Sequence, residues 1–218
     1  MKEIKNVYNG KSAFIVGELI VCGCQVLRAD ELDEAAKKFE VTQYKLNRIK
    51  TALNSETNWN EAIAHESPNV RVACVRQRRK LETLVSDRSW LVRREVVRQG
   101  FGLDILVNDK DFDVRKEVAK QGFGLDILIK DKNWLVRMEV AKQGYGLETL
   151  INDPEVAVRY EVAKQGFGLD ILIKDEYPAV RYEVAKQGFG LDILVNDECL
   201  DVRYEAEKQL KMLTQNVM

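Results

Sequence analysis

Apolar and polar positions follow a pattern that repeats every 22 residues along most of the chain. One arginine marks the same place in each unit. These arginines are Arg71, Arg93, Arg115, Arg137, Arg159, Arg181 and Arg203. A fixed period in this range is typical of small supersecondary units that stack on their neighbours. The pattern therefore predicts an array of about seven similar units.

One unit, taken from Asp153, predicts a longer helix, a glycine break and a short second element. Asp153 is suited to cap a helix, because its carboxylate can accept from free backbone N–H groups, and Pro154 is suited to the first helical position. Gly166 is placed where a left-handed residue ends many helices. The second element runs to about Lys174 and is either α-helical or 3₁₀. Asp175 then caps the next long helix.

The long helix of this unit has an apolar stripe that contains one charged residue. At about 100° per residue, Val158, Val162 and Ala163 fall on one side of the helix. Arg159 falls inside the same stripe, and a buried guanidinium needs partners. The acidic helix caps of neighbouring units are the obvious candidates, so we expect the arginines to form a structural ladder.

The far side of the long helix carries Tyr160, Glu161 and Lys164, which we expect to be exposed or to meet a partner. Tyr and Met are enriched at protein interfaces. The sequence therefore predicts a protein-binding stripe that consists of Met138, Tyr160, Tyr182 and Tyr204 with Lys142, Lys164 and Lys186. The alternative is that recent duplication copied one surface residue from unit to unit.

The repeated residues also resemble those of a known family. The unit of that family reads Asp-x-x-x-x-Val-Arg-x-x-Val-Ala followed by leucines. The matching positions here are Asp153, Val158, Arg159, Val162, Ala163, Leu169 and Leu172. The pattern resembles HEAT-like repeats, and within them the leucine-rich-repeat variant, over about residues 67–210. The unit here is shorter, with a tighter Gly-Phe-Gly link. The resemblance implies a mostly α fold, a right-handed αα-superhelix or solenoid, and usually a binding role.

The period divides the chain into three parts. Residues 1–54 do not follow it and predict a small α+β domain that caps the N-terminal end of the solenoid. Residues 55–70 form a junction, in which Ser67-Pro68 repeats the signal for a helix start. Residues 71–218 form the solenoid, and its first and last units are degenerate, as expected for terminal repeats.

The N-terminal part has its own signals for strands and helices. Asn9-Gly10 lies between two β-compatible runs, which indicates a hairpin. Residues 13–27 predict one or two strands. Asp30 can cap one helix and Thr42 another, with ends near residues 39 and 53.

Residues 33–50 also look like a helix-turn-helix. The positions that suit packing of two helices are Ala36, Val41, Leu46 and Ile49. The residues that would then face a DNA groove are Gln43, Tyr44, Lys45 and Asn47. Glu40 occupies the turn position that is normally Gly, and the first helix is acidic, which a phosphate backbone would repel. Two interpretations stay open, a DNA-reading motif or two helices that pack on a small sheet.

The charge of the chain is nearly balanced but unevenly distributed. The formal net charge is −1 at pH 7, so no global field indicates nucleic acid or a membrane as partner. Residues 71–98 are basic, and residues 137–202 are net acidic. Nucleic-acid binding is therefore the alternative function, with contacts from Arg76, Arg78, Arg79, Lys80, Arg94 and Arg98. A weaker alternative is an inhibitor whose acidic half imitates nucleic acid.

The sequence lacks the residue spacings of a catalytic or metal site. His65 is the only histidine, which argues against a His-rich metal site and most catalytic triads. The Gly-x-Gly pairs follow helices, so the context of a dinucleotide-binding loop is missing. Trp90 and Trp134 share one repeat position, which predicts packing in the core or as a hydrophobic staple. We expect no enzyme activity, no cofactor and no metal.

The remaining sequence signals concern the cellular compartment of the protein. The four cysteines are scattered, which indicates small core residues, and free thiols fit a reducing cytosol. No apolar run approaches the length of a membrane span, and the N-terminus lacks a signal-peptide core. The sequence therefore predicts a cytoplasmic, non-catalytic binding module. The favoured partner is a protein, for which the chain serves as a scaffold or adaptor.

Overall fold

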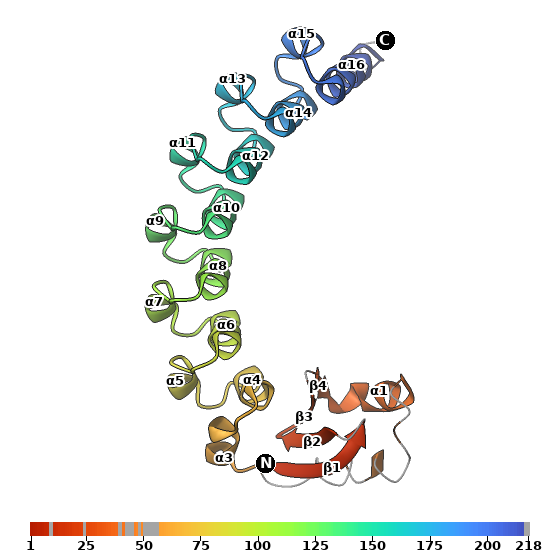
Figure 1. Cartoon of the computed structure of the whole chain (residues 1–218), viewed down its shortest axis with the longest axis vertical. Coiled ribbons are helices and arrows are strands. Elements are labelled where there is room, and N and C mark those ends of the chain that lie inside the picture. The colour runs from red at the N-terminus through yellow and green to blue at the C-terminus, as the bar shows by residue number, and fades with distance from the viewer. Residues whose placement is uncertain are drawn as a thin grey trace. The chain divides into compact units, whose positions relative to one another are not determined.

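The structure, a computed structural model, describes residues 1–8, 11–23, 25–38, 41, 46–47, 49 and 57–215. Most of these residues are helical, and successive helices pack in a row after a small antiparallel sheet (Figure 1). The chain forms two compact units, Met1–Glu117 and Val118–Met218. This division falls inside the repeated region, and the predicted boundary at residues 55–70 stays a prediction.

The first unit begins with a four-stranded antiparallel sheet in which each strand pairs with the next. The strands are β1 (Lys2–Tyr8), β2 (Lys11–Val16), β3 (Leu19–Cys22) and β4 (Gln25–Arg28). Tyr8 lies opposite Lys11, as the predicted hairpin requires. The predicted turn residues Asn9 and Gly10 lie outside the described residues. The segment predicted to hold one or two strands contributes to three.

One face of the sheet carries an apolar core. The buried residues of this cluster are Ile4, Val7, Ala13, Ile15, Ile20, Leu32, Ala36, Leu46 and Ile49, and Val41 packs against them. The packing role predicted for Ala36, Val41, Leu46 and Ile49 is therefore confirmed. Helix α1 (Leu32–Lys38) follows a 3₁₀ turn, η1 (Ala29–Glu31). Asp30 lies inside this turn rather than at a helix cap. The second predicted helix cap, Thr42, lies outside the described residues.

The sheet also packs on α4 (Pro68–Arg76), the first long helix. Val16 and Val21 are buried and alternate along their strands with residues of the apolar core, so they lie on the opposite face. The side chain of Gln77 donates to the carbonyl of Val16. Pro68 is the first residue of α4, as predicted, although the Ser67 side chain makes no capping hydrogen bond.

Short and long helices alternate along the rest of the chain. The first unit contains α3 (Trp59–Ala64), α4, α5 (Leu81–Leu84), α6 (Trp90–Arg98), α7 (Leu103–Leu106) and most of α8 (Phe112–Lys120). The second unit contains α9 (Leu125–Leu128), α10 (Trp134–Lys142), α11 (Leu147–Leu150), α12 (Val156–Lys164), α13 (Leu169–Leu172), α14 (Pro178–Lys186), α15 (Leu191–Leu194) and α16 (Leu200–Gln215). The starts of the long helices follow the 22-residue period of the sequence.

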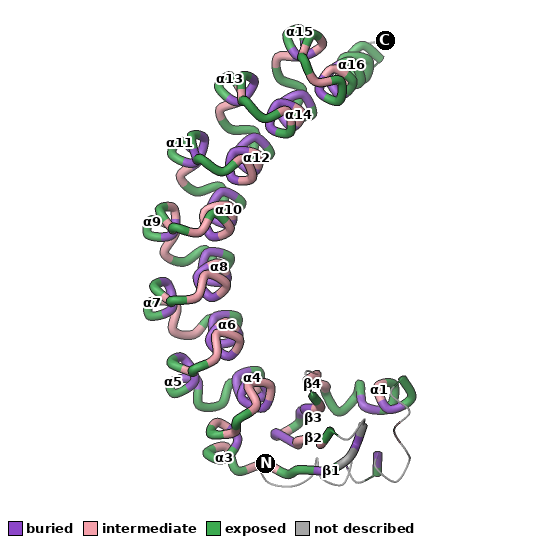
Figure 2. Tube along the Cα trace, viewed as in Figure 1, coloured by how far each residue is buried: buried purple, intermediate pink, exposed green. Residues whose placement is uncertain are grey.

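Within each unit, the long helices lie side by side and the short helices form a second layer (Figure 1). In the second unit, α12 packs on α10 and α14, and α14 packs on α16. Val158, Val162 and Ala163 are fully buried, which confirms the predicted stripe. Figure 2 shows that the buried residues of the long helices recur at each repeat. Each fully buried valine contributes roughly 1.5–3 kcal/mol to stability.

The long helix of the unit taken from Asp153 begins later than predicted. Helix α12 starts at Val156, so Asp153 and Pro154 precede it and the capping prediction is wrong. The carboxylate of Asp153 accepts instead from the backbone N–H of Glu155, at 2.9 Å. The same carboxylate also accepts from Arg137 of the preceding repeat. This second bond holds the carboxylate away from the end of the helix. Gly166 ends the helix with φ 72°, as predicted, and the second element is α-helical.

The predicted arginine ladder is confirmed for Arg71, Arg93, Arg137, Arg159 and Arg181, each of which joins two repeats. Nε and Nη2 of Arg159 donate to the carboxylate of Asp175 in the next repeat, at 2.6 and 3.0 Å. Nη1 donates to the carbonyl of Asp153 in the same repeat, at 2.8 Å. The same fork joins Arg71 to Asp87, Arg93 to Asp109, Arg137 to Asp153 and Arg181 to Asp197.

Candidate binding surface

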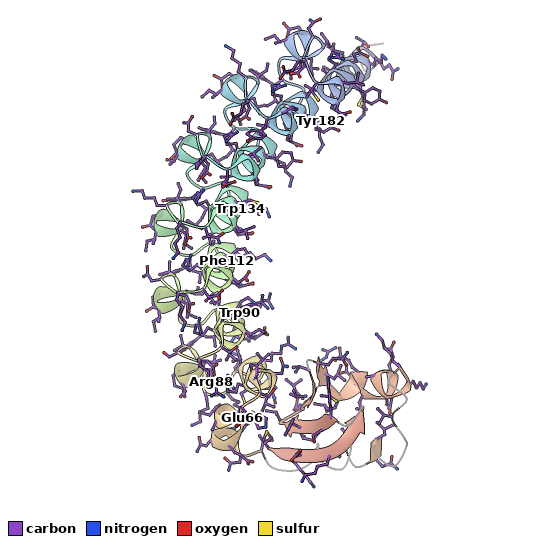
Figure 3. All side chains as sticks on the ribbon, in the orientation of Figure 1. Glu66, Arg88, Trp90, Phe112, Trp134 and Tyr182 are labelled. Carbon is purple, nitrogen blue, oxygen red and sulfur yellow. The ribbon has the colours of Figure 1, made fainter. Side chains whose placement is uncertain are left out.

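The predicted stripe residues occupy equivalent positions on consecutive long helices of the second unit. They are Met138 on α10, Tyr160 on α12, Tyr182 on α14 and Tyr204 on α16. Figure 3 shows Tyr182 on the side of α14 that faces away from α13. Tyr160 and Tyr182 are partly buried, whereas Tyr204 is 67 % exposed. The structure therefore brings the four residues onto one face of this unit.

Two of the tyrosines fasten one long helix to the next. The hydroxyl of Tyr160 donates to Oε2 of Glu183 at 3.1 Å, and the hydroxyl of Tyr182 donates to Oε2 of Glu205 at 3.2 Å. Burial, together with the charge of Glu183, raises the pKa of Tyr160. These rings are therefore fixed in place, and their polar ends already have partners.

Glutamates lie buried behind the stripe, and the sequence pattern did not indicate them. Glu161, predicted on the far side, is 6 % exposed, and Glu205 is 2 % exposed. The prediction was wrong because neighbouring long helices flank each helix on both sides and cover more than its apolar stripe. Burial alone would raise the pKa of Glu205, but hydrogen bonds from Gln209 and Lys208 outweigh it and lower the pKa.

A row of lysines accompanies these glutamates. The pairs are Lys142 with Glu139, Lys164 with Glu161, Lys186 with Glu183 and Lys208 with Glu205, at 3.8, 3.3, 3.4 and 3.1 Å between Nζ and a carboxylate oxygen. The lysine side chains are 38–51 % exposed, so they compensate the buried charges and remain accessible. Lys208 is missing from the predicted set, although it holds the same repeat position.

A groove of about 630 Å³ lies on this face, where α12, α14 and α16 meet. Tyr160, Tyr182 and Tyr204 line it together with Pro178, Val202 and the exposed carboxylate of Asp201. The sequence pattern indicated the three tyrosines but not Pro178, Val202 or Asp201. The signal for Pro178 was available, because it precedes Tyr182 by four residues and such pairs share one face of a helix.

The basic residues on the long helices of the first unit are only partly available. Nε of Arg76 lies 2.9 Å from a carboxylate oxygen of Glu95, and Nη1 of Arg98 lies 3.4 Å from the other. These two side chains are 42 % and 40 % exposed. The guanidinium of Arg94 stacks over Trp90, 4.8 Å from the ring centroid. Contacts within the protein therefore neutralise or cover part of this positive charge.

The other predicted basic residues form the turn between α4 and α5. Arg78, Arg79 and Lys80 are exposed. Arg78 and Lys80 have positive φ values of 54° and 57°, at positions where the next repeat has Gly100 and Gly102. Non-glycine residues in this left-handed region cost roughly 1–2 kcal/mol each. The first repeat thus retains two strained basic residues where glycine would fit.

Two further predictions concern the residues expected to face a DNA groove and the tryptophans of the repeats. Gln43, Tyr44 and Lys45 lie outside the described residues, and Asn47 is exposed. Trp134 is 37 % exposed, so it does not lie in the core, and the alternative of a hydrophobic staple stays a prediction. It begins a long helix, one turn before Met138, and Figure 3 labels it with Trp90 and Phe112, which begin the equivalent helices.

No cluster of three His, Cys, Asp or Glu side chains suited to a metal ion occurs among the described residues. His65 accepts from the backbone N–H of Ser67 at 3.0 Å, and its ring packs edge-on against Phe14. Cys74 is buried, and burial raises the pKa of its thiol to about 12. In the part of the chain that the structure describes, no helix is long and apolar enough to cross a membrane.

The fold and the surface together define a helical repeat protein with an aromatic groove on its layer of long helices. No model of a protein family matches the chain, and no curated protein matches it either.

Proposed function

We propose that the chain is a non-catalytic protein-binding module, a scaffold or adaptor built as a HEAT-like α-solenoid with a small α+β cap. The groove lined by Tyr160, Tyr182 and Tyr204 supports this proposal. Aromatic side chains are enriched at protein interfaces. Hydrogen bonds already hold two of the rings, so binding does not have to order them, which lowers its entropic cost.

Tyr204→Ala is the variant that tests this surface, because Tyr160 and Tyr182 also join helices. Tyr204 is largely exposed, so the fold should be unchanged by circular dichroism. We expect affinity capture from the source cell, after nuclease treatment and at high salt, to lose its protein partner. Ile193→Ala is the matched control, since Ile193 is 60 % exposed on the short-helix layer. Retention by Tyr204→Ala with loss by Ile193→Ala would contradict the proposal.

A second function, nucleic-acid binding through the first repeat, is favoured by the backbone of Arg78 and Lys80. Both residues adopt a strained conformation that glycine would relieve. Strain of this kind is concentrated at functional sites. Contacts from these cations to phosphate groups would account for their retention.

The double variant Arg78→Gly/Lys80→Gly tests this function without disturbing the turn. If both residues contact phosphates, its binding to random duplex DNA should be weaker. The slope of log K against log salt should then be shallower by about 1.8, because each phosphate contact contributes about 0.9. An unchanged slope would show that the first repeat does not bind nucleic acid through these residues.

A further inference from the structure

The groove on the second unit has features that select a particular kind of polypeptide, if the proposed protein-binding function holds. We propose that it binds an extended, proline-rich segment in the polyproline II conformation, with a basic residue of that segment at Asp201. This inference rests on the proposed function.

The chemistry of the lining favours proline over polar side chains. The hydroxyls of Tyr160 and Tyr182 are occupied by Glu183 and Glu205, so these rings offer mainly apolar surfaces to a ligand. Pro178 and the exposed Ala179 add further apolar surface. Grooves lined by aromatic residues are a recurrent binding site for proline-rich segments, which lose little entropy because they are already extended.

The arrangement of the tyrosines on consecutive helices suits the same conformation. They lie on consecutive packed helices, whose axes are about 8–10 Å apart in typical packing. A polyproline II helix has three residues per turn and rises about 3.1 Å per residue, so one side recurs about every 9 Å. An α-helical turn of about 5.4 Å, or two strand residues at about 6.8 Å, does not match this spacing. A ligand that crosses α12, α14 and α16 in this conformation can present one proline to each tyrosine.

The polar groups of the groove complement the rest of such a ligand. A polyproline II backbone has no internal hydrogen bonds, so its carbonyls need donors. Tyr204 is 67 % exposed, and its hydroxyl can donate to such a carbonyl. The ammonium of Lys208, which also pairs with Glu205, is a second donor in the lining. Asp201 is an exposed carboxylate at the same groove, and it can pair with an arginine or lysine of the ligand.

The test uses synthetic peptides and the full chain, with binding measured by calorimetry. The probe is one arginine followed by four Pro-Pro-Ala triplets. The controls are the same peptide with glutamate in place of arginine, and a helical alanine-rich peptide of equal length that carries one arginine. We expect the arginine–proline probe to bind more tightly than both controls. Tyr204→Ala should weaken its binding about tenfold or more, as a lost aromatic anchor does, and Tyr204→Phe by less.

The charge of Asp201 provides a reciprocal test. Asp201→Lys should reverse the preference, so that the glutamate–proline peptide binds more tightly than the arginine–proline probe. Equal binding of the helical control, binding unaffected by Tyr204→Ala, or an unchanged preference in Asp201→Lys would overturn the inference. If a cellular protein is nevertheless lost from Tyr204→Ala, the proposed function stands and only the proline-rich occupant is wrong. If Tyr204→Ala retains both the proline-rich peptide and the cellular protein, the proposed function fails as well.

Discussion

Three ladder arginines of the second unit, Arg137, Arg159 and Arg181, use the whole guanidinium to hold two repeats together. Arg159 is 8 % exposed and donates from Nε, Nη1 and Nη2. Breaking a buried ion pair costs about 3–5 kcal/mol, because the remaining charge stays buried without compensation. Lysine in this place keeps the positive charge but loses the planar fork of donors.

We therefore expect Arg159→Lys to lower the free energy of unfolding by about 2–3 kcal/mol, measured by urea denaturation. Arg203→Lys is the matched control. In the described part of the chain, Arg203 donates to the carbonyls of Asp197 and Glu198 and to no carboxylate. Its loss should stay below about 1 kcal/mol. Equal losses in the two variants would show that the carboxylate fork adds no stability.

The ladder also sets the response of the protein to acid. The hydrogen bond from Arg181 lowers the pKa of Asp197 below the usual 3.8. A carboxylate of this kind contributes stability above its unfolded pKa, and loses it as pH falls through the lower, folded pKa. We expect the free energy of unfolding to fall as pH drops below about 4. Asp197→Asn should be less stable at neutral pH and lose less on acidification. An acid-induced loss as large as that of the parent protein would contradict this assignment.

At the scale of the helical elements, the two glycines of each turn have different requirements. Gly166 and Gly168 both have positive φ, 72° and 60°. A Cβ on Gly166 would meet nothing within 4 Å, whereas a Cβ on Gly168 would overlap Cδ1 of Ile151 in the preceding repeat. The first position therefore demands only the backbone conformation, and the second also demands space.

We expect Gly166→Ala to lower the free energy of unfolding by about 1 kcal/mol through backbone strain. Gly168→Ala should cost about 2–4 kcal/mol, because overpacking against Ile151 adds to the strain. Urea denaturation of both variants measures the difference. Equal losses would indicate that Ile151 moves aside at no cost.

The turn of the first repeat should respond in the opposite direction. Arg78→Gly and Lys80→Gly replace strained residues with the residue that the other turns use. Each should raise the free energy of unfolding by about 0.5–1 kcal/mol, after the entropy that glycine adds to the unfolded chain. Thermal and urea denaturation can check this. A loss of stability would mean that contacts of these side chains outweigh the strain.

Sequence patterns predicted the apolar stripe and the pairing of arginines with acidic residues of neighbouring repeats, but missed the burial and hydrogen bonds that depend on how the long helices pack. The burial of Arg159 followed from helical spacing alone. The misplaced cap at Asp153 arose because capping rules take no account of the arginine that reaches its carboxylate from the preceding repeat. The burial of Glu161 was missed because it depends on neighbouring helices. The position of Tyr160 on the stripe was predicted. Its hydrogen bond to Glu183 was not, because the two residues are 23 apart in the sequence and lie on different helices.

At the scale of the whole molecule, the contacts between repeats recur at fixed separations. The ladder joins residues 16 apart, and the tyrosine hydrogen bonds join residues 23 apart. Removal of one complete repeat from the second unit therefore restores the same separations. Arg137 keeps its partner Asp153, whose carbonyl can then accept from Arg181.

We expect deletion of residues 154–175 to leave a folded protein with unchanged helicity per residue by circular dichroism. Deletion of residues 154–164 removes half of a repeat and breaks these separations, so the second unit should lose cooperative unfolding. The pair forms a matched comparison, since the shorter deletion should be the more harmful. A stable, cooperative protein after the shorter deletion would show that the register of the contacts does not determine the fold.

The ladder and the tyrosine bonds also give the second unit a polarity. Arg159 and Tyr160 both donate to residues of the following repeat. A cut between two repeats therefore leaves donors on the N-terminal fragment and carboxylate acceptors on the C-terminal one. Two identical ends cannot satisfy each other, because donors would face donors. Fragments of the second unit should accordingly reassociate in one order only, with the donors of one fragment against the carboxylates of the next.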